Sequence, residues 1–489
     1  MVAESEMYPD PNPAHMRRLA AWLTPERTIT LIMFMGIGTL ACLSPAHNDT
    51  WWHLRSGQEM AHTRAWMSDD RFTFTVHGAS FWNPAWLAQL IFYGLLLLGG
   101  LPLLTFVCAG VIVAAWVIAW RLMRGPFTDR LLLLAVALSS ATVTWSLRPQ
   151  VFSLLASMVV IRLAAYDRWR WLPPLFVLWA NLHAGFAMGI ALLIAAVVAA
   201  FVQDRERLWT RLGWTAVCGL ATLVTPFGLE NWRQIVASIG RSYANAIQEW
   251  QPTPWPPQQL AFWGLAVVLA VMAIRRWKSL EEPADRVVLV AAIVAFPLAM
   301  RSLRNVPTFM MIAAPALSRL LHPRQKAAAN LPATQRHPSR DLGVIAAALV
   351  AGLFVVATAW QQSWPMLGWR PIDSEEARAI AECPAPLYNT YESGGPIIWF
   401  VPSQPVFIDS RQDPFPIPFV QSATAVEATG DYEATFARWH INCAALPPQS
   451  PTAARLEKDG WLLRFSDQRW RVFERPGATT TTTTASQGP

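Results

Sequence analysis

The chain has 489 residues, of which 53% are hydrophobic and only 15% are charged, whereas an ordinary soluble protein carries roughly 25% charged residues. Its formal net charge of +7 is dispersed between apolar runs. Such dispersion is typical of the basic loops of membrane proteins and not of a nucleic-acid-binding surface. The composition therefore predicts a polytopic integral membrane protein.

Uncharged apolar runs recur along the chain, and each approaches the length of about 20 residues that a helix needs to cross a bilayer. The runs are Thr28–Ser44, Leu101–Trp120, Leu131–Leu147, Gly185–Val202, Ala261–Ile274, Val287–Met300 and Leu342–Trp360. Short basic segments alternate with segments rich in Trp, Asn, His and acidic residues. Because cytoplasmic loops carry the excess of Lys and Arg, we expect the N-terminus inside and about eleven transmembrane helices.

The stretch Trp86–Leu98 is the exception to this alternation, and Gly99-Gly100 separates it from the next apolar run. A helix of about 13 residues rises only about 20 Å, less than the roughly 30 Å of a hydrocarbon core. We therefore predict an interfacial or re-entrant helix that does not cross the membrane. If it did cross, every later loop would change sides.

The chain is expected to divide into four parts. These are a cytoplasmic N-terminal segment (residues 1–27), a transmembrane domain (28–363) whose outside loop (45–86) carries interfacial helices, a small α/β domain outside the membrane (364–476) and a disordered Thr-rich tail (477–489).

The α/β domain is predicted from short β-like stretches around two helical patterns, Ser374–Glu382 and Tyr432–Trp439. The expected strands are Leu387–Asn389, Ile397–Phe400, Val406–Ile408, Cys443–Leu446, Trp461–Phe465 and Trp470–Phe473. Cys383 and Cys443 both fall in this domain, and an oxidising compartment would allow them to form a disulfide. Their Cα atoms would then lie within roughly 7 Å.

Polar residues collect on the predicted outer face, beginning with His47–Leu54 just after the first apolar run. Polar side chains at a membrane boundary usually have a function. Asp49 could take a proton from an attacking hydroxyl, or it could ligate a divalent metal ion together with His53. Trp52 suits either an interfacial anchor or a contact with a substrate.

Three arginines lie at the same boundary. Arg148 follows an apolar run, and Arg301 and Arg304 are spaced i, i+3, with Asn305 beside them. Two guanidinium groups on one face of a helix end can clamp a phosphate. The alternative is that these side chains extend to lipid phosphates without a specific ligand.

Three further residues are candidates for lining a cavity at this face. Asn181 and His183 interrupt an apolar segment, and Glu249 ends an amphipathic stretch. The histidine could instead be a hydrogen-bonded packing residue, and the glutamate a solvated loop acid. The chain contains no phosphate-binding loop, no H-E-x-x-H motif and no nucleophile elbow.

A set of motifs extends over almost the whole chain. It comprises Asp49-Thr-Trp-Trp-His-Leu-x-x-Gly57, Asp70-Arg-Phe-Thr-Phe-Thr75, Trp86-Leu-Ala-Gln89, Arg148-Pro-Gln-Val-Phe-Ser153, Trp179-Ala-Asn-Leu-His183, Thr225-Pro-Phe-Gly228, Glu249-Trp-Gln251, Arg301-x-x-Arg304-Asn305, Tyr388-Asn-x-Tyr391-x-x-Gly-Gly395 and Val406-Phe-Ile-Asp-Ser-Arg411. The set resembles the GT-C class of membrane glycosyltransferases, and more closely a family of bacterial membrane proteins grouped with them that has a DxWWHLxxG motif in its first loop. Asn48-Asp49 stands here where that class often has an Asp-Glu pair.

The resemblance implies transfer of a sugar from a polyprenyl-phosphate or polyprenyl-diphosphate donor at the outer face of the bacterial cytoplasmic membrane. Asp49 would be the general base or a metal ligand, and Asp69 or Asp70, of which we favour Asp70, falls where a second carboxylate of the first loop is often found. Arg148, Arg301 and Arg304 would hold the donor phosphate. The implied partners are membrane lipids, the lipid-linked sugar donor and a glycan, lipid or protein acceptor, with no nucleic acid.

Two other classes of function remain as alternatives. A transporter or flippase could move an anionic glycolipid or polysaccharide, although such proteins often contain internal repeats and this sequence shows none. A non-catalytic scaffold could bind an envelope partner through the outside domain.

Overall fold

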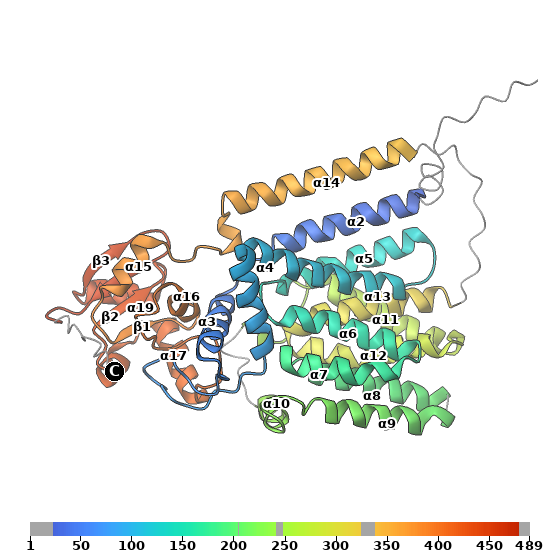
Figure 1. Ribbon diagram of the computed structural model, residues 1–489, viewed down its shortest axis with the longest axis horizontal. Helices are drawn as coiled ribbons and strands as arrows, with labels where there is room; N and C mark the ends of the chain where they lie inside the picture. Colours follow the sequence, from blue (N-terminus) through green and yellow to red (C-terminus); the bar gives the residue numbers. More distant parts are fainter. Residues whose placement is uncertain (1–22, 204, 241–247, 324–337, 479–489) are drawn as a thin grey trace, which may run out of the picture.

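The computed structural model describes residues 23–203, 205–240, 248–323 and 338–478. A bundle of roughly parallel helices carries a small α/β domain at one end (Figure 1). Most of the predicted N-terminal segment and of the Thr-rich tail lies outside the described residues.

The bundle is built from helices of different lengths. They are α2 (Pro25–Cys42), the second part of α4 (Trp86–Leu122), α5 (Phe127–Ala141), α6 (Gln150–Ala165), α7 (Leu172–Leu182), α8 (Phe186–Gln203), α9 (Leu208–Ala221), α11 (Leu260–Arg276), α12 (Pro283–Arg301), α13 (Val306–Leu321) and α14 (Pro338–Gln361). Among the described residues, five helical stretches are long and apolar enough to cross a membrane: Trp86–Leu122, Phe127–Thr144, Leu260–Ser279, Pro283–Arg301 and Arg340–Gln361. The total of about eleven crossings remains a prediction.

The bundle has a central helix and an apolar outer surface. Every residue of α13 from Val306 to Leu320 is buried. By contrast, α14 lies beside α2 at the edge of the bundle (Figure 1) and leaves Phe354 71% exposed. A helix in water keeps such side chains on its inner face. The outward apolar side chains of α14 therefore indicate a membrane protein.

A buried ion-pair cluster joins three helices at the end of the bundle away from the α/β domain. Asp285, near the start of α12, accepts hydrogen bonds from Arg124 (2.8 Å) and from Arg319 of α13 (2.5 Å). Arg319 also donates to the carbonyl of Leu122, the last residue of α4 (2.7 Å). The two arginines compensate the buried carboxylate, so this cluster can exist in an apolar bundle.

The predicted break after Leu98 is confirmed. Gly99 and Gly100 have non-helical backbone angles inside α4, and Gly100 has φ = 67°, a value that glycine adopts without strain. The part of α4 before the break runs across the end of the bundle beside α3 (Asn48–Thr63) (Figure 1). That direction agrees with an interfacial helix, although its position relative to a bilayer remains a prediction.

The α/β domain contains a four-stranded sheet of order β1-β2-β4-β3. β1 (Leu387–Asn389) is parallel to β2 (Cys443–Leu446), whereas β4 (Arg471–Glu474) is antiparallel to β2 and to β3 (Leu462–Ser466). The helices of the domain are α15 (Ser374–Ala381), α16 (Gly394–Phe400), α17 (Ile417–Thr429), α18 (Glu433–Trp439) and α19 (Pro451–Lys458).

Two of the expected strands are wrong. Ile397–Phe400 belongs to α16, because a four-residue apolar run fits a buried helix as well as a strand, and Pro396 suits the first turn of a helix. Val406–Ile408 makes only an isolated bridge, in which Val406 pairs with Thr73 of the first loop. The sequence patterns also missed α17 and α19.

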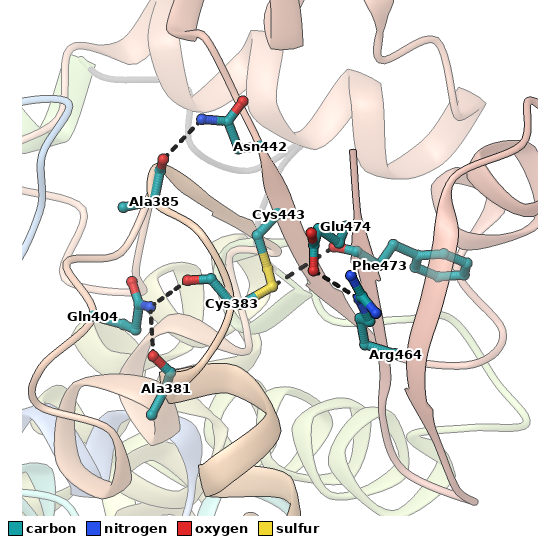
Figure 2. The surroundings of a disulfide bond; sticks show 9 residues. All are labelled: Ala381, Cys383, Ala385, Gln404, Asn442, Cys443, Arg464, Phe473 and Glu474. Carbon is teal, nitrogen blue, oxygen red and sulfur yellow. Dashed lines mark hydrogen bonds and ion pairs between the residues drawn. A yellow bond between two sulfur atoms is a disulfide. The ribbon is translucent and has the colours of Figure 1, made fainter. Parts of the chain in front are cut away.

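The predicted disulfide between Cys383 and Cys443 is confirmed. It links Cys383, which lies two residues after α15, to Cys443, the first residue of β2 (Figure 2). Their Cα atoms are 5.8 Å apart. Next to it, the Gln404 side chain donates to the carbonyls of Ala381 (3.2 Å) and Cys383 (2.8 Å). These bonds hold the turn that presents Cys383 to the sheet.

We expect the double variant Cys383→Ala/Cys443→Ala to destabilise the α/β domain. The bond closes a loop with a sequence separation of 60, for which the chain-entropy estimate is about 4 kcal/mol. Limited proteolysis at rising temperature should cleave the domain of the variant well below the temperature needed for the wild type. The single variant Cys218→Ala, which removes a buried free thiol of the bundle, is the control. Equal cleavage temperatures would show that the disulfide does not stabilise the domain.

Candidate functional site

The start of α3 fixes the position of Asp49 at the end of the bundle. His47 caps the helix by accepting a hydrogen bond from the backbone N–H of Asp49 (3.3 Å). The Thr50 hydroxyl donates to the carbonyl of Leu147 (2.8 Å), so the first turn of α3 is tied to the residue before Arg148. The local structure thus brings Asp49 next to Arg148, 99 residues later in the chain.

Arg148 forms ion pairs with two carboxylates. Its Nη1 donates to Asp49 Oδ2 (3.0 Å) and to Glu249 Oε2 (3.1 Å), while its Nη2 donates to the other oxygen of Glu249. Its Nε donates to the Ser146 hydroxyl (2.7 Å). Glu249 lies in η4 (Gln248–Trp250), and its backbone carbonyl accepts a hydrogen bond from Ser302 (3.0 Å). The structure therefore brings together Asp49, Arg148 and Glu249, three of the candidate site residues of the sequence analysis.

The electrostatics of this group are dominated by burial and by Arg148. Burial acts to raise the pKa of Asp49. The charge of Arg148, together with smaller contributions from His47, His53 and the Ser410 hydrogen bond, outweighs burial and holds that pKa well below the usual range. The pKa of Glu249 is lowered in the same way, against the effect of burial. Both carboxylates are therefore ionised at neutral pH. Arg148 carries one positive charge for these two negative charges, and Arg304 supplies a second positive charge close to Glu249.

The α/β domain supplies residues that sequence reasoning missed. The Ser410 hydroxyl donates to Asp49 Oδ1, which also accepts from the Trp52 indole (3.2 Å). The Asn48 side chain donates to Glu392, in the turn before α16. Ser410 lies within the motif Val406–Arg411 and Glu392 within the motif Tyr388–Gly395. Their positions in these motifs were the feature of the sequence that could have marked them as functional. Nothing in the sequence indicated that these motifs contact Asp49.

A glycine allows this contact. A Cβ on Gly395 would lie 2.3 Å from the backbone oxygen of Asn48. Contacts this short do not occur, so a larger residue at position 395 would separate α16 from α3. The neighbouring Gly394 serves packing within the α/β domain, because its Cβ would lie 2.2 Å from the backbone oxygen of Ile408.

Arg304 lies near the same group but is not neutralised by it. Its guanidinium stacks over the Trp250 ring at 4.7 Å. Burial lowers the pKa of Arg304, and the charge of Glu249 partly offsets this effect. Within the described ranges, its side chain forms neither an ion pair nor a hydrogen bond. Arg304 is therefore the cation of the site that is open to an anionic ligand.

The predicted clamp of Arg301 and Arg304 on one helix face is wrong in its geometry. Arg301 is the last residue of α12 and is exposed, whereas Ser302 is extended (φ −149°, ψ 123°) and Arg304 belongs to the separate turn η6 (Leu303–Asn305). The break comes at the helix end, where an i, i+3 spacing no longer places side chains on one face. Asn305 donates to the carbonyl of Leu298 (3.1 Å) and so closes the end of α12.

His183 follows α7 and is half-buried. The backbone N–H of Gly185 donates to its Nδ1 (3.0 Å), and the Ser153 hydroxyl lies 2.8 Å from the same atom. Because Nδ1 accepts, the proton of the neutral ring is assigned to Nε2. Burial and the charge of Arg304 hold the pKa of His183 well below its usual value. In the described part of the chain Nε2 has no hydrogen-bond partner, so it can donate to a ligand.

The two residues expected to ligate a metal ion, Asp49 and His53, have other partners in the structure. His53 stacks on Trp52, and its Nδ1 lies 3.1 Å from the amide nitrogen of Gln89, which in turn bonds Asn83. Burial lowers the pKa of His53 to about 3, despite the charge of Asp49. No group of three or more His, Cys, Asp or Glu side chains in the described residues could hold a metal ion.

Asn181 is used for packing at the edge of the site. Its amide donates to the carbonyls of Val177 and Val224 (both 2.8 Å), and its oxygen accepts from the Trp86 indole (2.8 Å). These bonds link α7, the turn after α9 and the start of α4. Asn181 also borders an open groove of about 600 Å³ between Trp66, Trp86 and Pro226.

Asp70 lies in a separate cluster. It is fully buried and pairs with Arg411, which also binds Asp409 through two hydrogen bonds (2.7 and 2.8 Å). The other oxygen of Asp70 accepts from the Thr73 hydroxyl (2.7 Å) and backbone N–H (3.2 Å). Both oxygens are thus occupied, and the structure does not bring Asp70 to Asp49. Its contacts are those of a residue that fastens the first loop to the α/β domain.

No protein-family model and no curated protein matches the chain. Among solved structures, it is similar to the crystal structure of ArnT from Cupriavidus metallidurans in the apo state. The sequence identity is 15%, the alignment covers 91% of this chain and 97% of that chain, and the TM-score is 0.48. This likeness is too weak to assign a fold or an activity.

We expect Arg148→Gln to be strongly destabilising, because it leaves the carboxylates of Asp49 and Glu249 mostly buried and uncompensated. Removal of one partner from a buried ion pair usually costs about 3–5 kcal/mol. Thermal denaturation of the protein in detergent measures the effect, and the double variant Arg148→Gln/Glu249→Gln should recover part of the loss. Arg233→Gln, which breaks an exposed pair with Glu230, is the matched control. Equal midpoints for the two single variants would contradict the assigned role of Arg148.

Proposed function

We propose that this protein is a glycosyltransferase that moves a sugar from a polyprenyl-phosphate or polyprenyl-diphosphate donor to an acceptor hydroxyl. The observation that carries the proposal is the site at the end of the apolar bundle. There an ionised Asp49 is held next to Arg148, and Arg304 remains open to an anion. A donor with a lipid tail stays in the bilayer, so its phosphate is presented at the level of these residues.

The chemistry assigns a role to each side chain. Asp49 accepts the proton of the acceptor hydroxyl as the acceptor oxygen bonds to the anomeric carbon of the sugar. The bond between that carbon and the phosphate oxygen breaks, and its electron pair leaves with the phosphate. Arg304 stabilises the charge that develops on this group, and the Nε2–H of His183 can donate a hydrogen bond to it.

Binding of the donor would also make Asp49 a better base. In the free protein Arg148 holds the pKa of Asp49 low, so Asp49 is a weak proton acceptor. A donor phosphate near Arg148 adds negative charge, which raises the pKa of a neighbouring carboxylate. Proton transfer from the acceptor is then favoured only when the donor is in place.

The two alternatives fit the contacts less well. A transporter needs two arrangements of its helices around one site. Here side-chain bonds of Asp49 and Thr50 join the start of α3 to the residues before α6 and to the α/β domain. A scaffold gives no reason for Arg304 to lie unpaired beside two carboxylates. We further propose a multi-pass protein of the bacterial cytoplasmic membrane with the N-terminus inside and the α/β domain outside. The disulfide favours that orientation, because structural disulfides persist in oxidising compartments.

We expect Asp49→Asn to abolish transfer without unfolding the protein, since Asn keeps the size of the side chain and still accepts from Ser410. Loss of a general base typically lowers turnover by about 10²–10⁴-fold. Mass spectrometry of lipid-linked sugars and glycans, in cells with the wild type, the variant or no protein, should show a lost product and accumulated donor in the last two. Asp431→Asn changes an exposed carboxylate and serves as control. An unchanged product with Asp49→Asn would rule out a chemical role for this residue.

The orientation can be tested with two introduced cysteines at exposed positions, Thr128→Cys near the start of α5 and Ser422→Cys in α17. The native free thiols are buried and should not react. In intact cells with the outer membrane opened, a membrane-impermeant maleimide should label position 422, and it should label position 128 only after the cytoplasmic membrane is disrupted. Labelling of position 128 in intact cells would overturn the topology.

A further inference from the structure

A second polar pocket lies at the end of the bundle away from Asp49. Its residues come from η2 (Trp169–Trp171), the residues before it, η3 (Arg205–Arg207) and the start of α9. The pocket has a volume of about 300 Å³ and is lined by Asp167, Arg168, Trp169, Arg170, Arg207, Thr210, Arg211 and Trp214. Because α6 connects Gln150, beside Arg148, to this region over 16 residues, the two sites are about 24 Å apart.

The pocket is strongly basic. Among the described residues, four arginines and one carboxylate line it. Asp167 is bound by Arg207 (2.6 Å) and lies 3.7 Å from Arg211. Arg168 and Arg170 are exposed at its rim. The lining therefore favours an anionic ligand.

Arg211 gives the pocket a buried donor without a partner. Only 4% of this residue is exposed, and its Nε forms no hydrogen bond with any described residue. The guanidinium lies 6.0 Å from the centre of the Trp169 ring, which covers one of its sides. A buried donor left unsatisfied costs about 1–3 kcal/mol, so such a group is expected to bind a protein atom, a water molecule or an ion.

The surroundings place the mouth of the pocket at a membrane surface. Trp171 and Trp209 flank it and are 56% and 78% exposed. Tryptophans with outward rings are typical of the interface between lipid headgroups and acyl chains. An anion that reaches this depth is more readily a lipid headgroup than a solute.

We propose that this pocket binds the phosphate of an anionic phospholipid headgroup, with Arg211 at its base and Arg168 and Arg170 at its rim. The phosphate oxygens would accept charge-assisted hydrogen bonds from the guanidinium groups, and the acyl chains would lie against the outer surfaces of α8 and α9. The assignment is independent of the proposed transfer reaction. It gives the bundle a lipid contact at the end opposite the reacting group.

Native mass spectrometry of the delipidated full chain in detergent tests this site. Phosphatidylglycerol, phosphatidylcholine and inorganic phosphate are added separately at equal concentration. We expect one retained phosphatidylglycerol, and Arg211→Gln should weaken its retention by about tenfold or more, because a charge-assisted hydrogen bond is lost. Equal retention of phosphatidylglycerol and phosphatidylcholine would overturn the proposal. Retention of phosphate without phosphatidylglycerol would overturn the lipid assignment.

A second variant keeps the test decisive if Arg211→Gln does not fold. Arg168→Gln/Arg170→Gln changes exposed residues and should also weaken retention of phosphatidylglycerol. Arg275→Gln removes an arginine near the end of α11 that is also exposed but lies outside the pocket, and it should leave retention unchanged. A similar loss in Arg275→Gln would show that overall charge, and not the pocket, retains the lipid.

Discussion

The guanidinium group of Arg148 connects segments that are far apart in the sequence. It pairs with Asp49 at the start of α3 and with Glu249 in η4, and it is itself held by Ser146 before α6. Without its charge, two mostly buried carboxylates would repel each other at the end of an apolar bundle, where water screens little. The same charge sets the protonation state of Asp49. The position of the site and its acid–base behaviour therefore depend on one interaction.

The α/β domain is part of the site and not an appendage to it. Ser410 bonds Asp49 directly, and Gly395 lets α16 approach the first turn of α3. Arg411, next to Ser410, is fixed between Phe72 and Phe81 and pairs with Asp70 of the first loop. The backbone therefore carries a rigid ion pair on one side and the hydroxyl donor to Asp49 on the other. A displacement of the domain would therefore move the Ser410 hydroxyl away from Asp49.

Local sequence patterns were sufficient to predict a membrane protein, the break at Gly99-Gly100 and the α/β domain. The common location of Asp49, Arg148 and Glu249 was expected from polar residues at one boundary, but their ion pairs were not. The disulfide was expected from two cysteines in one domain. Other features depended on tertiary contacts that local patterns do not contain. Asp70 and Asp49 looked alike in sequence, yet partners 341 and 99 residues away separate their roles. The extended backbone of Ser302, which separates Arg301 from Arg304, could not be predicted from the local sequence either.

The pairing of Asp70 with Arg411 also has a consequence for biosynthesis. The two residues are 341 positions apart, and a ribosome adds about 5–20 residues per second, so their ion pair can form only some 20 to 70 s after Asp70 is made. During that interval the first loop lacks its partner, and a carboxylate destined for complete burial stays hydrated. Chains truncated before residue 411 would never acquire this pair. Quality-control proteases could therefore distinguish finished from unfinished copies by the state of the first loop alone.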